Sequence, residues 1–515
     1  MNLLLVMNKK EREGSIMRKI AHWAKTLAPA TKIRIIHYSR PTLILEALDF
    51  SPDVMLIFPL TSRNSASLPV VLKAACGTTV VTLETEGGTG YDTSQGYLKQ
   101  FVGYDKYSSS LVDYSLYWGP HDARHIGGLF FQEGKIASQS RNLTFGYPLY
   151  EVYASESLLK REQDKLAPSI QKKLDNYPDD KRILFVTGFH TADYTREDCI
   201  NAADLFDIDT DYAKELEAVL VRVEREKLRR DQWVRAIRTL AERRPDIQCV
   251  IKTHPIEIAL KKHRGTNHYE ALAALPNVAL ISDIDATVCQ LLGRSKALVH
   301  YGSTVVAESY LLNRASVFVF CPRLHGAYAD YYRQGRDPKG WPSTHATTIE
   351  DLGTVVDTLL ETPGTHCPRP DGADAVLLDF FNLTDPADYL PSRDIAAFLV
   401  TLAGKAQALS PTDKYALDHL QANFEHIHDK LAYKALTALV GGHLDRLAKI
   451  AGQMQQLGKF PLSLTARGQL HVVSARLSQR CLEIGEQTAA SDVQTTNMLM
   501  SLANAFLDAV PEEGE

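Results

Sequence analysis

The sequence contains few cysteines and none of the spacings with which cysteines bind metals. Its seven cysteines are an odd number among 515 residues, no two of them form a C-x-x-C pair, and several lie inside apolar runs. Cysteines of this kind are typical of the reduced interior of cytoplasmic proteins, and they support neither a zinc site nor a disulfide framework. We therefore expect a cytoplasmic protein.

Long apolar runs and an excess of one charge are also missing. No stretch approaches the ~20 apolar residues of a membrane-spanning helix, and residues 1–8 are too short for a signal peptide and lack a cleavage site. The formal net charge is -5, and the basic run 222–230 is interleaved with Glu224 and Glu226. Because such a run is typical of a solvated helix face, we expect no nucleic-acid partner.

An acidic pair suited to holding a divalent cation is missing as well. The segment 283–285, Asp-Ile-Asp, comes nearest to an Asp-x-Asp motif. It precedes a helical segment, where we expect no cation to be held, and a divalent cation prefers carboxylate oxygens that converge on one point. We therefore expect no metal and no other cofactor.

What the sequence does contain is an alternation of apolar strand-like runs with amphipathic helical segments. The alternation starts at residues 3–7, gives way to a charged, helix-prone connector at 155–180, and restarts at 182–188. It is typical of a parallel sheet covered by helices on both faces, and a chain of this length is too long for a single core. We predict an α/β protein with two facing Rossmann-like, doubly wound domains, at residues 1–155 and 181–405.

The end of the chain has a different pattern. The short apolar helix expected at 395–402 could cross back onto the first domain, and residues 411–515 show only helical periodicity. We predict an all-α bundle there, without internal repeats and with no function that its residues indicate.

Two segments of the second domain contain the residues that we expect to bind a ligand. The apolar run 248–252 ends in Thr253-His254-Pro255, and the run 297–300 is followed by Gly302-Ser303-Thr304 and a helical pattern that contains Glu308. Because proline cannot donate to a sheet ladder, the first strand must end there. Ligands bind beyond the carboxyl ends of parallel strands, where free N–H groups at a helix start favour phosphate. Both segments therefore predict a nucleotide or sugar-nucleotide site between the domains.

The first domain contributes an acidic turn. The strand-like run 78–83 ends in Glu84-Thr85-Glu86-Gly87-Gly88. The glycines free the backbone, and both carboxylates can reach a site at the strand end. The ordinary alternative is a solvated turn with incidental acids, but the position at a strand end favours function.

Two aspartates stand near the start of the second domain. Asp231 precedes an apolar pattern at Trp233 and Ile237, so we expect it at a helix start, where a simple capping role is the ordinary interpretation. Asp193 lies in the long insertion 189–230.

These motifs resemble a known family. Lys252-x-His254-Pro255, the His300-x-Gly302-Ser303-Thr304 turn with Glu308, and the acidic turn at 84–87 are together similar to the retaining β-Kdo glycosyltransferases of bacterial lipopolysaccharide and capsule assembly, which have the GT-B fold. The resemblance covers roughly residues 1–405. The segment 146–150 departs from the family's corresponding motif, so no role is assigned to it.

The resemblance implies transfer of Kdo from CMP-Kdo to a lipid-linked O-antigen or capsule acceptor with retention of the β configuration. Such a double displacement needs a carboxylate nucleophile and a second group that deprotonates the acceptor. The expected nucleophile is Asp231, with Asp193 in reserve, and Glu86 backed by Glu84 is the expected acid/base. The expected donor-binding residues are Lys252, His254, Pro255, His300, Gly302, Ser303, Thr304 and Glu308, although His300 could equally be a packed strand-end histidine. Peripheral association with the inner membrane or with a polysaccharide assembly complex is compatible with this role.

Two alternatives remain open. A non-hydrolysing sugar-nucleotide 2-epimerase shares this architecture and also uses a glycine-serine turn and a ribose-binding glutamate. A non-catalytic scaffold with the same fold would instead use the C-terminal helices to hold partners. Binding of CMP, of UDP or of neither distinguishes the three hypotheses.

Overall fold

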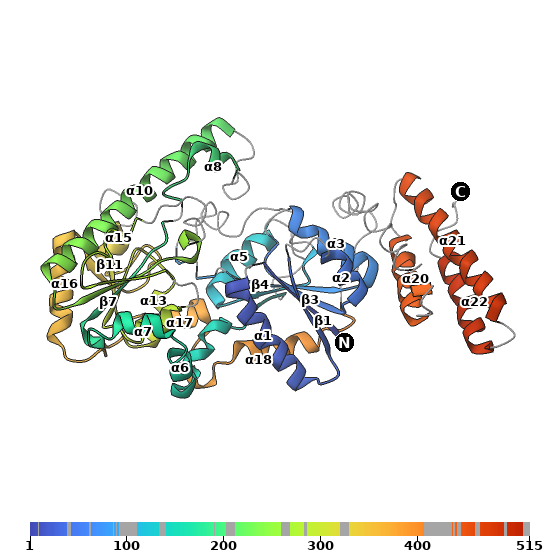
Figure 1. Ribbon diagram of the computed structural model, residues 1–515, viewed down its shortest axis with the longest axis horizontal. Helices are drawn as coiled ribbons and strands as arrows, with labels where there is room; N and C mark the ends of the chain where they lie inside the picture. The colour runs from blue at the N-terminus through green and yellow to red at the C-terminus, as the bar shows by residue number, and fades with distance from the viewer. Residues whose placement is uncertain are drawn as a thin grey trace.

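The computed structural model describes most of the chain (Figure 1). The described residues are 1–8, 10–38, 43–60, 63–85, 87–88, 90–91, 111–132, 141–189, 191–201, 212–258, 268–282, 286–319, 329–405, 435, 438–439, 444–458, 464–488 and 492–507.

The first domain is a parallel sheet with strand order β2-β1-β3-β4-β5-β6. Its central strands are buried apolar runs, as expected for a sheet covered on both faces. The strands are β1 (Asn2–Met7), β2 (Lys32–His37), β3 (Val54–Ile57), β4 (Thr79–Leu83), β5 (Tyr114–Tyr117) and β6 (Asn142–Thr144), and the helices are α1 (Lys10–Leu27), α2 (Leu43–Phe50), α3 (Arg63–Cys76) and α5 (Pro120–Gln132).

The second domain repeats the architecture with strand order β12-β11-β10-β7-β8-β9, again all parallel. Its strands are β7 (Arg182–Val186), β8 (Gln248–Lys252), β9 (Val278–Ile281), β10 (Ala297–His300), β11 (Ala315–Val319) and β12 (Thr344–Ala346). Its helices are α8 (Arg196–Asn201), α10 (Tyr212–Arg243), α12 (Val288–Leu292), α13 (Val306–Leu311), α15 (Ala329–Arg333), α16 (Ile349–Glu361) and α17 (Ala373–Phe381). The sheet therefore continues beyond residue 320, although the three residues of β12 are too few to show a period in the sequence.

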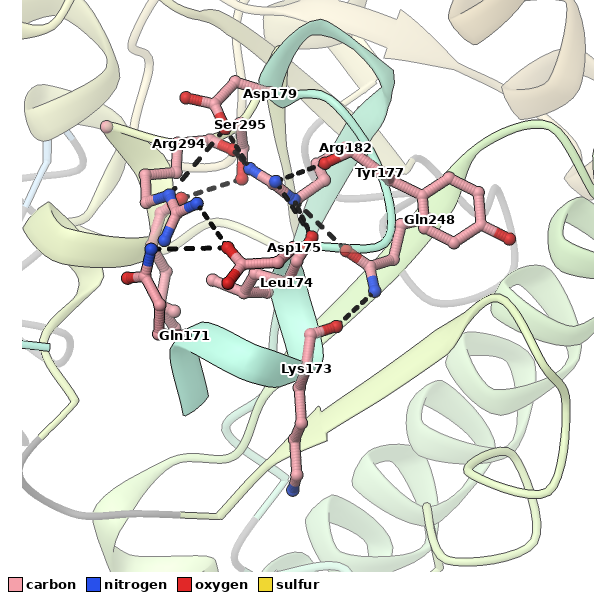
Figure 2. A network of polar contacts seen from close by, with 12 residues as sticks. Gln171, Lys173, Leu174, Asp175, Tyr177, Asp179, Arg182, Gln248, Arg294 and Ser295 are labelled. Atoms are coloured by element: carbon pink, nitrogen blue, oxygen red, sulfur yellow. Dashed lines mark hydrogen bonds and ion pairs between the residues drawn. The ribbon is translucent and has the colours of Figure 1, made fainter. Parts of the chain in front are cut away.

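The connector between the domains is held onto the second domain by polar contacts, and the buried Arg182 lies at their centre (Figure 2). It consists of η3 (Pro148–Ala154), α6 (Glu156–Gln163), α7 (Pro168–Leu174) and η4 (Asp179–Lys181). Arg182, the first residue of β7, is 1% exposed and donates to the carbonyls of Leu174 (2.9 Å), Tyr177 and Arg294 (2.6 Å). Because guanidinium N–H groups must be satisfied when buried, Arg182 locks the end of the connector to the amino edge of the second sheet.

Helix α18 (Pro391–Val400) returns from the second domain to the first, as the sequence predicted. Its residues Ile395 and Leu399 belong to the same buried cluster as Ile16 and Ile20 of α1, and the two helices are in contact. Two facing doubly wound domains with a returning helix form a GT-B-like architecture, which confirms the predicted fold class.

The C-terminal helices pack on the first domain. They are α20 (Leu444–Gly458), α21 (Leu464–Thr488) and α22 (Val493–Leu507). Leu447 and Ile450 of α20 share a buried cluster with residues of α3, and the Gln453 amide donates to the carbonyl of Leu48 at 2.7 Å. Figure 1 shows the three helices at the α2 and α3 side of the molecule, far from the second domain. No helix among the described residues is long and apolar enough to cross a membrane.

Candidate functional site

The carboxyl ends of strands β4 and β10 face each other across the domain boundary. Gly88 follows β4, and a Cβ atom placed on it would lie 3.1 Å from Thr304 Cγ2, in the turn after β10. Gly88 has a positive φ of 74°, which glycine adopts without strain. The structure therefore brings together the acidic turn of the first domain and the glycine-serine-threonine turn of the second.

A loop that the sequence analysis did not single out holds the acidic turn in place. Lys339 donates from Nζ to the carbonyl of Gly88 at 2.7 Å, while the N–H of Gly88 donates to Asp122 of the first domain at 2.8 Å. The carbonyl of Lys339 also accepts the N–H of Tyr91 at 2.8 Å. The Gly88 peptide is thus held from both sides, by one residue of each domain.

Asp337 organises this loop from within. It is fully buried, and its Oδ1 accepts the N–H groups of Lys339 (2.9 Å) and Trp341 (3.0 Å). Burial raises the pKa of Asp337 to about 7 and lowers the pKa of Lys339, although each charge partly offsets the other's shift. The Asp-Pro-Lys-Gly composition of 337–340 is typical of a turn, but no local pattern in the sequence shows that its partner is Gly88.

Aromatic residues fill the boundary beside these turns. Trp118, at the end of β5, stacks on Tyr147 with ring centroids 3.8 Å apart. The hydroxyl of Tyr389 accepts the N–H of Tyr147 at 2.6 Å and donates to the carbonyl of Phe381 at 2.7 Å. The segment 146–150, to which no function was assigned, therefore has a packing role between the domains.

His254 lies at the carboxyl end of β8, where the sequence placed it. Its N–H donates to Thr187 Oγ1 at 2.9 Å, and its Nδ1 accepts the N–H of Ile256 at 3.2 Å. Nδ1 therefore acts as an acceptor, and the neutral ring carries its proton on Nε2. Lys252 is the buried last residue of β8, whereas Pro255 is exposed.

Glu257 supports the turn that carries His254. Its carboxylate accepts hydrogen bonds from the Thr187 hydroxyl, from the N–H of Phe189 (3.1 Å) and from the Tyr269 hydroxyl (3.2 Å). Burial raises its pKa, and these hydrogen bonds oppose that shift. Glu257 thereby ties the turn after β7 to the turn after β8, a role that the sequence did not indicate.

His300 is a packed strand-end histidine in this structure. It is fully buried, its Nδ1 accepts the N–H of Gly302 at 3.1 Å, and its Nε2 lies 3.0 Å from Ser343 Oγ. Burial lowers the pKa of His300 to about 3, so the ring is neutral at physiological pH. Since both ring nitrogens have protein partners, the geometry favours the packing interpretation over ligand contact.

The turn after His300 differs from the expected helix start. The N–H groups of Val306, Ala307 and Glu308 are already bonded to carbonyls three residues earlier, so α13 does not offer them to a ligand. In the described part of the chain, the backbone N–H groups of Ser303 and Thr304 have no hydrogen-bond partner. An anion at this turn would therefore be met by residues 303 and 304 rather than by the first turn of the helix.

Glu308 faces the connector. Its Oε2 accepts a hydrogen bond of 2.6 Å from the hydroxyl of Tyr153 in η3. Burial raises the pKa of Glu308 to about 7, and the hydrogen bond from Tyr153 opposes that shift. The predicted ribose contact is thus a partly buried carboxylate beside the domain boundary.

Asp231 is not at a helix start, which corrects the sequence analysis. It lies in the middle of α10, because the charged run before it continues the helix with pairs such as Arg229–Glu226 (2.7 Å). Its side chain is 52% exposed and lies 3.4 Å from Arg230. No helix dipole therefore acts on Asp231, and its capping role is excluded.

The reserve candidate, Asp193, shares the same arginine. Arg230 lies 2.5 Å from Asp193, and His268 Nε2 lies 2.9 Å from the other carboxylate oxygen. The pKa of Asp193 is lowered because these two partners outweigh the opposing effect of burial. Both nucleophile candidates, Asp193 and Asp231, therefore lie beside the guanidinium of Arg230.

The acidic turn is described only in part. The Oε1 of Glu84 accepts the N–H of Thr85 at 2.8 Å, and the carbonyl of Glu84 accepts the indole N–H of Trp118 at 2.7 Å. The predicted acid/base, Glu86, and the segment 283–285 lie outside the described residues.

No protein-family model and no curated protein matches this chain. Among solved structures, the UDP-GlcNAc 2-epimerase of Methanocaldococcus jannaschii in complex with UDP-GlcNAc and UDP covers 78% of this chain and 100% of its own, with 12% identity and a TM-score of 0.44. The UDP-GlcNAc 2-epimerase of Neisseria meningitidis bound to UDP-GlcNAc gives the same four values. The wall teichoic acid polymerase TagF covers 79% of this chain and 90% of its own, with 13% identity and a TM-score of 0.44.

Proposed function

We propose that this protein is a glycosyltransferase that takes its sugar from a nucleotide donor bound between the two domains. The observation that carries the proposal is the meeting of the Gly88 and Thr304 turns, each at the carboxyl end of a parallel strand. Parallel sheets bind ligands at this edge, and a two-domain enzyme needs groups from both edges at one reacting centre.

The proposed donor is CMP-Kdo, and the motif resemblance supports this choice. The Nε2 proton of His254 suits contact with the phosphate or with the Kdo carboxylate, with Lys252 and Pro255 completing that strand end. The N–H groups and hydroxyls of Ser303 and Thr304 provide further donors beside Gly302, and Glu308 accepts the ribose hydroxyls.

The proposed reaction keeps the β configuration through two displacements. In the first, a carboxylate oxygen attacks the anomeric carbon and the bond to the CMP phosphate breaks; in the second, the acceptor oxygen attacks the same carbon and releases the carboxylate. Asp231 is the proposed nucleophile and Asp193 the reserve. Glu86, with Glu84 behind it, is the proposed base that removes the acceptor proton.

The proposed partners are a CMP-sugar and a lipid-linked O-antigen or capsule glycan, met in the cytoplasm at the inner membrane or at an assembly complex. No metal or cofactor enters the proposed reaction. Turnover that is lost with EDTA and restored by magnesium would overturn the metal-independent part of the proposal.

Calorimetry with CMP and UDP tests the site. We expect CMP to bind the wild type and to bind at least tenfold more weakly to His254→Ala, since the variant loses a charge-assisted contact worth more than ~1.4 kcal/mol. His366→Ala, at an exposed position, is the matched control. Binding of UDP alone would favour the epimerase, and binding of neither nucleotide would favour the scaffold.

Intact-protein mass spectrometry tests the mechanism. After incubation with CMP-Kdo, we expect the mass of Kdo on a peptide that contains Asp231, and no adduct on Asp231→Asn. An adduct on a peptide that contains Asp193 would move the nucleophile to that residue. A fully active Asp231→Asn enzyme would remove Asp231 from the mechanism.

A further inference from the structure

The predicted ribose-binding carboxylate has a partner in a distant part of the chain. Tyr153 belongs to η3, the first element of the connector, and its hydroxyl donates to Glu308 Oε2 in α13 of the second domain at 2.6 Å. Tyr153 is 8% exposed, and its hydrogen bond to the half-buried Glu308 is largely shielded from solvent. A short hydrogen bond to a carboxylate in such surroundings is stronger than one in water.

The surroundings of Glu308 make this hydrogen bond important. The titratable groups that face it are Tyr150 and Tyr153 from η3 and Cys289 from α12. Among the residues that the structure describes, no lysine or arginine pairs with Glu308. The charge of this carboxylate therefore depends on a tyrosine hydroxyl rather than on a cation.

We propose that Tyr153 is a positioning residue for nucleotide binding: its hydroxyl holds Glu308 ionised and oriented, so that the carboxylate can accept the ribose hydroxyls of the donor. The inference rests on the proposed function, which assigns Glu308 to the ribose. A carboxylate accepts from two hydroxyls only while it is ionised, because the protonated form turns one oxygen into a donor. Through Tyr153, the connector thereby affects how tightly the proposed site binds its nucleotide.

Nucleotide binding should depend on pH differently in Tyr153→Phe and in the wild type. Because burial already raises the pKa of Glu308 to about 7, removing the Tyr153 hydroxyl must raise it further. The nucleotide would then lose its acceptor at a higher pH in Tyr153→Phe than in the wild type. Tyr153 itself stays protonated across this range, since burial raises its own pKa well above the usual value.

The experiment compares CMP with 2′,3′-dideoxycytidine monophosphate by calorimetry between pH 6 and pH 9. We expect Tyr153→Phe to bind CMP on the order of tenfold more weakly than the wild type at pH 7, with most of the loss recovered at pH 9. The dideoxy probe should bind both proteins equally. Titration of the phosphate affects wild type and variant alike, so it cancels in the comparison.

Tyr150→Phe is the matched control. Tyr150 lies in the same helix, and its hydroxyl is 3.5 Å from the carbonyl of Thr304 rather than bonded to Glu308. The inference would be overturned if Tyr153→Phe behaved like Tyr150→Phe at every pH, or if it lost affinity for both probes. In either case, CMP binding by the wild type would still support the proposed nucleotide site. If the wild type binds UDP instead, UDP and its 2′,3′-dideoxy form serve as the pair. Absence of any nucleotide binding would overturn the proposed function and the inference together.

Discussion

Replacing Lys339 by methionine should loosen the acidic turn of the first domain. Methionine keeps most of the apolar stem but removes the ammonium group that donates to the carbonyl of Gly88 at 2.7 Å. A buried hydrogen bond from a charged donor contributes ~1.5–3 kcal/mol. The N–H of Gly88 keeps its bond to Asp122, so the turn should open more often without unfolding the domain.

Hydrogen exchange at the Gly88 amide, followed by mass spectrometry, measures this opening. Because 1.4 kcal/mol corresponds to a factor of ten, we expect exchange roughly 10- to 150-fold faster in Lys339→Met than in the wild type. We would measure exchange near pH 8, which is above the raised pKa of Asp337, so that this carboxylate is ionised. At that pH, Lys339→Met also removes the positive charge beside the Asp337 carboxylate, which is a second effect of the substitution. Combining Lys339→Met with Asp337→Asn should remove this second effect.

A matched control separates the contact from the loss of a charge. Lys165→Met removes an ammonium group from the connector, where the side chain is 66% exposed and pairs with Glu162. We expect no change in Gly88 exchange for this variant. If Lys339→Met leaves the exchange of Gly88 at the wild-type rate, the Lys339 contact does not hold the turn and the reasoning fails.

Three further predictions concern stability. Arg182→Met should lower the melting temperature measured by calorimetry, because the buried carbonyls that accept from the guanidinium would lose their donors, at a cost of ~3–5 kcal/mol. An unchanged melting temperature would contradict the role of Arg182 in holding the connector. His300 has a pKa of about 3 when folded and an ordinary value of 6.5, so the unfolded state binds the proton more tightly and stability falls as the pH drops below 6.5, by ~2 kcal/mol at pH 5. A His300→Gln variant should lack that loss, and identical pH dependence of urea midpoints in both proteins would refute it. Truncation after Gly404 should lower the melting temperature of the first domain, because α20 no longer covers α3, while transfer to a soluble acceptor should persist; an inactive but folded truncation would place part of the catalytic unit in the removed helices.

Local patterns in the sequence were sufficient to predict two parallel sheets, without the edge strand β12, and the return of α18. Buried parallel strands read as short apolar runs, and each run is a property of neighbouring residues, so β1, β4, β8 and β10 could be located before any packing was known. The carboxyl ends of these strands then followed directly, which is why His254 and Thr304 were found at strand ends.

The helix start at Asp231 could not be predicted from the same kind of pattern. The sequence indicated a new helix because the apolar period begins at Trp233, but α10 begins at Tyr212. Its earlier part is stabilised by helix propensity, by ion pairs along its surface and by a small apolar contact with residues such as Cys199. A helix that projects from its domain, as Figure 1 shows for α10, needs only a narrow buried stripe, so its start leaves a weak signal in the sequence.

The sequence by itself determined which residue types stand at the strand ends, and the tertiary structure alone decided which of them meet. Tyr153 and Glu308 are 155 positions apart, and Gly88 and Lys339 are 251 positions apart. No periodicity connects such pairs, because their contact depends on how the two domains pack and on where the connector passes between them. Burial at that boundary then raises the pKa values of Glu308 and Asp337 to about 7, a property that belongs to the assembled interface and to no segment of the chain alone.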